Sequence, residues 1–309
     1  MLPMDRFVIL LYHGVTERTH RGIQNCSRKQ LPSAQFERQM EHLAQGYRVL
    51  PLRELVRLSV ARAVPTRAVA VTFDDGFENN CSVAFPILER FQIPATFFLS
   101  TGHIGTDKAF WVDKVEYLLN ETAEPELFLP PLERSFRLRT LADREGALTE
   151  IKAALKKVPG LIEPTVSEME CRLQVAPRYD YPDYRTLSWD QVRQMRRSGL
   201  YEFGAHSVDH AILTHLNLAE KEAQIRGSQE TLERELQEPV DLFSYPEGQG
   251  AHFDEETIGL LRSAGFSVSC TALFGFNTEE TSPFHLRRNM VEFAAPFEEC
   301  LEPLHAACR

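Results

Sequence analysis

The stretch AVAVTFDDG at residues 68–76 joins a short apolar run to two adjacent aspartates and a glycine. A run of this length that is apolar at successive positions predicts a strand buried on both faces, as in a parallel sheet. Asp74 and Asp75 then fall at the carboxyl end of that strand. Because neighbouring carboxylates repel each other, the pair forms either an ordinary solvated turn or a site that uses both charges.

The same pattern recurs along the chain and predicts the fold class. Five further apolar runs end in polar residues: FVILLYHG (7–14), ATFFLSTGHIG (95–105), YEFGAHSVDH (201–210), DLFSYPEG (241–248) and FSVSCTAL (266–273). Helical patterns lie between several of them, at 33–46, 82–92, 189–199 and 219–237. This alternation predicts an α/β fold with a parallel sheet or barrel, whose functional groups gather at the carboxyl ends of the strands.

Residues 107–185 interrupt the alternation. They contain WVDKVEYLLN (111–120), a loop rich in proline and leucine, and a helical pattern rich in lysine and glutamate. We expect a mostly helical insertion within a single domain that spans residues 1–309.

Composition and charge indicate which partners and which cellular compartment to expect. The net charge of −10 over 309 residues disfavours broad contact with nucleic acid. The six cysteines form no CxxC pair, which disfavours a thiolate zinc site or a disulfide framework. The apolar run FVILLY (7–12) is too short for a signal peptide or a membrane span. These features predict a cytoplasmic protein with no nucleic-acid partner and no transmembrane segment.

The polar residues at the strand ends are of the types that serve as metal ligands and as acid–base groups. Two imidazoles, from His206 and His210, and one carboxylate form a common ligand set for Zn²⁺ or another divalent cation. A second carboxylate beside the first can take a proton from water. The set therefore predicts metal-assisted hydrolysis, although the residues alone do not say which of Asp74 and Asp75 has which role.

TFDDG (72–76) followed by HSVDH (206–210) resembles the first two motifs of the polysaccharide deacetylases, carbohydrate esterase family 4. LLYHGV (10–15), IPATFFLSTGHIG (93–105) and LSWDQVRQMRRSGLYEFGAHS (187–207) are similar to segments of its exopolysaccharide and poly-N-acetylglucosamine deacetylase branch. The resemblance implies a distorted (β/α)7 barrel. It also implies a hydrolase that removes N-acetyl groups from an amino-sugar glycan or glycan precursor.

The resemblance assigns the two aspartates. Asp74 takes the place of the catalytic base, and Asp75, His206 and His210 take the places of the metal ligands. Zinc is the expected metal, with cobalt, nickel and iron as alternatives that accept the same ligands.

One departure from the family concerns the partner of the base. Classical members carry an arginine two residues before the proline of the third motif and an aromatic after it, where this chain has Ser244 and Glu247. SPFHLRRNMVE (282–292) resembles the final strand of the exopolysaccharide branch and offers a substitute. We expect Arg288 to hold Asp74, with Arg287 as second candidate.

The catalytic acid and the substrate contacts are also predicted. His13 is the expected acid and His285 its rival, because the classical Leu-x-His motif is absent. Tyr245 and Pro246 are expected to contact substrate, and a backbone N–H near Tyr245 to stabilise the oxyanion. Trp189 is expected mainly to pack, with contact to substrate as the alternative.

Glu247 either repels Asp74 or selects a cationic or polar substrate. Two other functions compete with the N-deacetylase. One is an O-deacetylase or small-amide hydrolase that uses the same metal site. The other is a catalytically weak scaffold that binds metal and sugar in polysaccharide assembly. The presence of Asp74 favours an enzyme, because a binding module has no need of a base.

Overall fold

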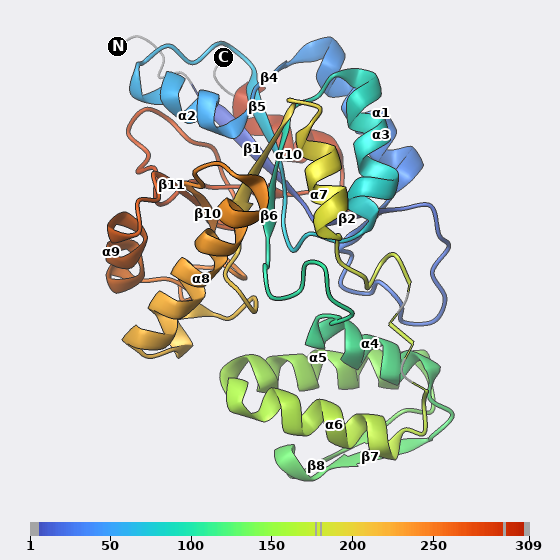
Figure 1. Ribbon diagram of the computed structural model, residues 1–309. Helices are drawn as coiled ribbons and strands as arrows, with labels where there is room; N and C mark the ends of the chain where they lie inside the picture. The colour runs from blue at the N-terminus through green and yellow to red at the C-terminus, as the bar shows by residue number, and fades with distance from the viewer. Residues whose placement is uncertain (1–5, 177, 180, 293–294, 306–309) are drawn as a thin grey trace. The chain divides into compact units, whose positions relative to one another are not determined.

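The computed structural model describes residues 6–176, 178–179, 181–292 and 295–305 (Figure 1). The chain divides into two compact units. The first contains residues up to 17, residues 29–106 and residues from 186 onward, and the second contains residues 18–28 and 107–185. No helix in the described part of the chain is both long enough and apolar enough to cross a membrane.

A curled parallel sheet forms the centre of the first unit. Its strands, in spatial order, are β11 (Val268–Cys270), β10 (Leu242–Ser244), β9 (Tyr201–Ala205), β6 (Ala95–Leu99), β5 (Ala68–Phe73), β1 (Phe7–Tyr12) and β12 (Asn289–Met290), with β4 (Arg48–Val49) also paired to β5. Each of the six predicted apolar runs contains one of these strands, and β1 and β5 are buried at every position. The fold class expected from the sequence, a distorted parallel α/β barrel, is confirmed.

Helices cover this sheet. They are α1 (Ser33–Gly46), α2 (Leu52–Val60), α3 (Phe85–Phe91), α7 (Trp189–Arg196), α8 (Leu218–Leu236), α9 (Glu255–Ser263) and α10 (Phe297–His305). The four predicted helices are confirmed, and α7 and α8 each begin with a capping box, at Ser188 and Asn217. The predicted helix at 82–92 has an unexpected start, because a π-helical turn, Asn80–Ala84, precedes α3. Such turns occur often at functional sites.

A row of aromatic rings fixes the register of four neighbouring strands. Tyr12, Phe73, Phe97 and Phe203 are paired partners on β1, β5, β6 and β9. Their ring centroids are 5.3, 4.8 and 5.8 Å apart along the row. Because successive side chains on a strand point to opposite faces, the burial of Phe73 on this face directs Asp74 to the other face.

A small parallel ladder lies beside the carboxyl end of β1. It joins β2 (Gly14–Thr16) to β3 (Gln30–Pro32), and the Gly14 N–H donates to Lys29 O over 3.1 Å. The sequence patterns did not predict this ladder. It places residues 29 and 30 next to the segment that follows His13.

The second unit has its own apolar core. It contains α4 (Trp111–Glu121), α5 (Leu141–Lys157) and α6 (Ile162–Arg172), with an antiparallel hairpin of β7 (Glu126–Leu129) and β8 (Arg134–Arg137). The sequence predicted a mostly helical insertion at 107–185, but neither the hairpin nor the inclusion of residues 18–28. This segment is held by hydrogen bonds from Ile23 N to Asn120 Oδ1 and from Asn25 N to Glu116 Oε1, both 2.8 Å long.

Candidate metal and catalytic site

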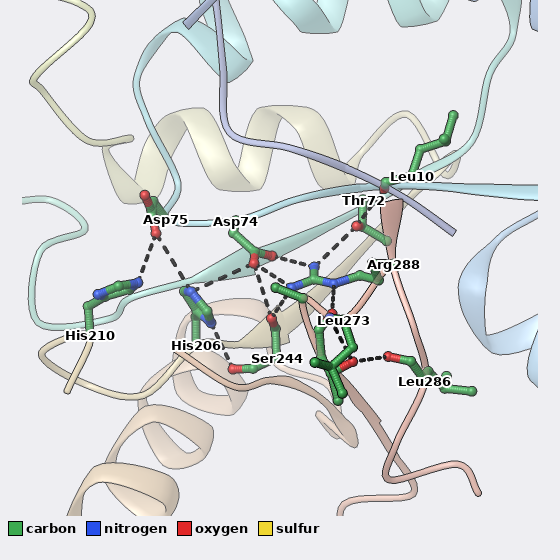
Figure 2. Close-up of polar contacts among 12 residues, drawn as sticks. Leu10, Thr72, Asp74, Asp75, His206, His210, Ser244, Leu273, Leu286 and Arg288 are labelled. Atoms are coloured by element: carbon green, nitrogen blue, oxygen red, sulfur yellow. Dashed lines mark hydrogen bonds and ion pairs between the residues drawn. The ribbon is translucent and has the colours of Figure 1, made fainter. Parts of the chain in front are cut away.

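Polar side chains from four segments converge near the carboxyl edge of the large sheet (Figure 2). Asp74 and Asp75 follow β5 directly, and the Asp74 N–H still donates to Tyr12 O of β1 over 3.0 Å. His206 follows β9, Ser244 ends β10, and Arg288 precedes β12. Parallel strands end at the same edge, which is why the aspartates and His206, about 130 positions apart in the sequence, meet there. Arg288 instead precedes β12, whose Asn289 pairs with Leu10 of β1, and its side chain reaches Asp74.

Asp75, His206 and His210 form a three-residue cluster. Asp75 Oδ1 lies 3.3 Å from His210 Nε2 and 3.6 Å from His206 Nε2, and the three donor atoms all lie within 4.8 Å of one another. Asp75 and His206 are each only 1% exposed. Among the described residues, none donates a hydrogen bond to Asp75 Oδ1.

A buried carboxylate oxygen without a donor calls for an explanation, and a site for a cation is one. One carboxylate and two imidazoles are donors that suit zinc and other divalent transition metals. The residues present at this edge therefore fit such an ion.

The tautomer of His206 is set by its other ring nitrogen. His206 Nδ1 lies 2.7 Å from Ser244 O, a carbonyl that can only accept, so Nδ1 donates the hydrogen bond. The lone pair is then on Nε2, the atom that faces Asp75 (Figure 2). An imidazole whose second nitrogen is bonded to a carbonyl in this way is oriented for a metal.

Arg288 holds Asp74 by two parallel hydrogen bonds (Figure 2). Nη1 donates to Asp74 Oδ1 over 2.7 Å and Nη2 to Asp74 Oδ2 over 2.6 Å. The guanidinium also donates to Ser244 Oγ, Thr271 O and Thr72 Oγ1, and Arg288 is only 1% exposed. This bidentate geometry fixes both the position and the plane of the Asp74 carboxylate.

Electrostatics keep Asp74 ionised. Burial raises the pKa of the Asp74 carboxyl, but the adjacent Arg288 guanidinium and, to a lesser degree, His206 outweigh burial. The net pKa of Asp74 lies below its ordinary value. The carboxylate can therefore accept a proton at neutral pH.

The groups around Asp75 have the protonation states that metal binding requires. Burial raises the pKa of Asp75, but Lys29 and the nearby histidines lower that pKa by more than burial raises it. The net pKa lies far below its ordinary value. Burial lowers the pKa of His210 to about 4. At neutral pH the cluster thus presents a charged carboxylate and a neutral His210 ring, the forms that bind metal.

The backbone at this edge is strained. Asp75, Ser207, His210 and Glu247 have φ values of 73°, 60°, 54° and 61°, in the left-handed region that residues with a side chain seldom adopt. Such conformations cluster at functional sites because the surrounding structure has to hold them.

Gly76 closes the turn after Asp75. Its φ is 84°, and a Cβ there would lie 2.8 Å from side-chain carbons of Leu99 and Ile104. Only glycine therefore fits after the two aspartates without displacing the core.

The structure separates the two predicted acid candidates. His13 follows β1 at the same edge, half-buried, and its carbonyl accepts a 2.7 Å hydrogen bond from Asn80 Nδ2. Burial lowers the pKa of His13, while the negative charges of Asp75 and Asp74 partly offset burial. The His285 ring instead packs against Phe253, with 5.5 Å between centroids.

The third-motif turn differs from the expectation that Tyr245 contacts substrate. The Tyr245 ring is buried and stacks on Phe253 at 4.3 Å, and its hydroxyl donates to Phe284 O. Its N–H donates to Cys270 O over 3.1 Å, as part of the sheet, so it is not directed to an oxyanion. Pro246 is buried as well. The Tyr245 side chain therefore stabilises the turn by packing under it, against Phe253.

Trp189 has the packing position that was expected first. It is the first residue of α7, it is half-buried, and it packs against the main apolar core. Its indole covers Gly105, where a Cβ would lie 2.8 Å from the ring.

Two contributors at this edge were not recognised in the sequence. Lys29 Nζ lies 3.4 Å from Asp75 Oδ2, and Asn80 holds the backbone of His13. Neither residue belongs to a motif that indicates chemistry. Only the parallel β2–β3 ladder and the π-helical turn bring them to the site.

Comparison with known proteins identifies the family. The polysaccharide deacetylase model matches residues 61–269. The chain belongs to the polysaccharide deacetylase family.

Curated relatives within the family include the poly-beta-1,6-N-acetyl-D-glucosamine N-deacetylase of Staphylococcus aureus, 35% identical over 96 residues. That alignment covers 31% of this chain and 32% of the relative. The enzyme of the same name from Staphylococcus epidermidis is 32% identical over 105 residues, which cover 34% of this chain and 33% of the relative. The chain thus matches about a third of the length of these curated relatives.

Solved structures support the fold along the whole chain. The Streptococcus pyogenes deacetylase PplD, in complex with acetate, superposes with a TM-score of 0.63 at 17% identity, with 99% of each chain covered. IcaB from Ammonifex degensii gives a TM-score of 0.63 at 20% identity, with 99% of this chain and 98% of IcaB covered. At these identities the likeness establishes the fold.

Proposed function

We propose that this protein is a metal-dependent hydrolase that removes acetyl groups from the amino-sugar residues of a glycan or glycan precursor. The observation that supports this most directly is the pairing of two distinct carboxylates. Asp74 is held by Arg288, and Asp75 faces His206 and His210. The poly-N-acetylglucosamine deacetylases among its relatives indicate the class of substrate.

Asp75, His206 and His210 would hold the metal. A divalent cation there supplies a Lewis acid that polarises the acetamide carbonyl and makes water a stronger nucleophile. Zinc suits the two imidazoles and the carboxylate best, and cobalt, nickel and iron accept the same donors.

Asp74 acts as the general base. It is ionised, it is buried, its plane is fixed by Arg288, and its Oδ2 lies 3.8 Å from His206 Nε2. It takes a proton from the attacking water as the new carbon–oxygen bond forms. A positioned base of this kind contributes about 10²–10⁴-fold to the rate.

His13 is the proposed proton donor to the leaving amine. The carbon–nitrogen bond breaks as the nitrogen takes this proton, and the products are acetate and a free amino sugar. Burial lowers the pKa of His13 and the negative charges of Asp75 and Asp74 partly offset burial, while Asn80 holds the backbone from which the ring projects.

Release of acetate tests the proposal. N-acetylglucosamine oligomers and O-acetylated oligosaccharides would be incubated with the zinc-loaded protein, with and without a chelator. We expect acetate from the N-acetylated oligomers alone, and only without the chelator. Release from the O-acetylated set would indicate an esterase instead, and no release from either set by a zinc-loaded protein would favour the scaffold function.

Asp74→Asn is the matched variant for the base. It should still bind zinc but lose at least about 100-fold in turnover. Asp190→Asn is the control, because Asp190 is exposed on α7 and pairs with Arg193. Turnover of Asp74→Asn close to wild type would contradict the assignment of the base.

A further inference from the structure

Lys29 is a charged residue at the site to which the proposed mechanism gives no role. Its ammonium lies 3.4 Å from Asp75 Oδ2, and its side chain is 21% exposed. The other oxygen of the same carboxylate, Oδ1, faces the two imidazoles. The two oxygens of Asp75 therefore have different neighbours, a cation on one side and two imidazole nitrogens on the other.

The local fold holds Lys29 in this position. Its carbonyl accepts the 3.1 Å hydrogen bond from Gly14 N, and the next residue, Gln30, pairs with Gly14 in the β2–β3 ladder. Gln30 Oε1 accepts a 2.7 Å hydrogen bond from Asn79 Nδ2, and Asn79 Oδ1 accepts one from Val15 N. Lys29 thus extends from a backbone that pairs with the segment after His13, and the side chain of its neighbour Gln30 is bonded to Asn79, which follows the turn at Asp75.

Gly14 is required for this arrangement. A Cβ on Gly14 would lie 1.8 Å from Gln30 Oε1, so the Gln30 amide occupies the space that any side chain would need. The amide also packs close to the chain directly after His13. The contact links the positions of His13 and Lys29.

We propose that Lys29 is a positioning residue that keeps Asp75 Oδ2 away from the metal, so that Asp75 offers only Oδ1. This inference rests on the metal centre of the proposed function. A carboxylate held by one oxygen leaves more coordination positions for water and substrate than one that chelates with both. The ammonium achieves this in two ways: it hydrogen-bonds Oδ2, and it repels a cation that approaches that oxygen.

Lys29 also sets how tightly the metal is held. The Asp74 charge is matched by Arg288 and the Asp75 charge by Lys29, so these four side chains sum to zero before a metal binds. Removal of the Lys29 charge leaves a net negative site and frees the second carboxylate oxygen. Both changes favour a divalent cation, and a unit charge at this range in a mostly buried site outweighs the loss of one long hydrogen bond.

Zinc affinity is the readout. Metal-stripped protein would be titrated with Zn²⁺ against a chromophoric chelator of known affinity. Lys29→Met should bind zinc about tenfold more tightly than wild type or better, because the repelling charge is gone. Lys29→Arg keeps the charge and should stay within about threefold of wild type. Lys157→Met makes the same chemical change on the exposed end of α5 and should have no effect.

The possible outcomes distinguish failure of the Lys29 role from failure of the proposed metal centre. Unchanged or weaker zinc binding by a folded Lys29→Met protein would overturn the positioning role, because a merely structural lysine predicts loss of affinity. Lys29→Gln gives the same measurement if the methionine variant does not fold. Absence of zinc binding by the wild-type protein would overturn the proposed metal centre itself, and this inference with it.

Discussion

Arg288 lies beside Ser244, with 2.7 Å between Nη2 and Oγ. In the family's classical third motif an arginine stands at the position of Ser244 and holds the base. The short serine side chain leaves that volume open, and the guanidinium from the segment before β12 fills it. The hydroxyl also donates to Asp74 Oδ2 over 3.2 Å. The partner of the base thus comes from a different strand, although its contact with the base is of the expected kind.

Arg288→Ala should be strongly destabilising. It would leave Asp74 buried without a counter-charge, and breaking a buried ion pair in this way costs about 3–5 kcal/mol of unfolding free energy. Arg288→Lys should lose less, because the charge remains but the bidentate contact is lost. Urea denaturation measures both, and acetate release from the lysine variant measures the effect on turnover.

Arg287 is the matched control for that experiment. It is exposed and donates to Phe274 O, so Arg287→Ala should change stability by no more than about 0.5 kcal/mol. A larger loss for Arg287→Ala than for Arg288→Ala would contradict the assignment.

His206→Ala should abolish tight zinc binding. The variant removes one of three clustered donor atoms and the hydrogen bond to Ser244 O that orients it. Metal content after dialysis, measured by elemental analysis, should fall from about one zinc per chain to near zero. His215→Ala, in an exposed turn, should keep the wild-type content. Full zinc content in His206→Ala would count against the ligand set.

The stability of the metal-free protein should depend on pH through His210. The unfolded chain takes up this proton near pH 6.5, whereas the pKa in the folded chain is about 4. Between these values the unfolded state binds more protons, so the unfolding free energy falls as the pH falls. The slope contributed by His210 is up to about 1.4 kcal/mol per pH unit.

Denaturation in the presence of a chelator, at several values between pH 7 and pH 4.5, measures that slope. His210→Gln should reduce it. Asp74 and Asp75 do not contribute in this range, because their pKa values are lowered from an ordinary value of 3.8. Equal slopes for wild type and His210→Gln would show that His210 is not held neutral by burial.

Tyr245→Phe tests whether this tyrosine packs or contacts substrate. The variant removes the 3.1 Å hydrogen bond to Phe284 O but keeps the ring on Phe253, so it should cost about 0.5–1.5 kcal/mol of unfolding free energy. The Michaelis constant for N-acetylated oligomers should not change. A raised Michaelis constant without loss of stability would instead place the hydroxyl in contact with substrate.

Local pattern alone predicted the strands and much of the site. Apolar runs buried on both faces identify strands of a parallel sheet, and they ended where the polar motifs begin. Because parallel strands end at a common edge, TFDDG (72–76) and HSVDH (206–210) were expected to meet, and the structure brings them together. These inferences needed only the order of residues along each strand.

Three features depended on contacts between distant parts of the chain. Arg288 rather than Arg287 faces Asp74 because of the register of β12 beside β1. Lys29 reaches Asp75 because β3 pairs with β2, and residues 18–28 join the second unit through hydrogen bonds to α4. No periodicity encodes such pairings.

The sequence by itself determined which residues could do the chemistry: two aspartates and two histidines at the ends of buried strands. The family resemblance also predicted Arg288 for Asp74, with Arg287 second. The tertiary structure decided between these two arginines and brought Lys29, which no pattern indicated, to Asp75. Hydrophobic patterning within a strand depends only on neighbours in the chain, so the sequence alone reveals it. The partner of a buried charge depends on which distant segment the fold places a few ångströms away.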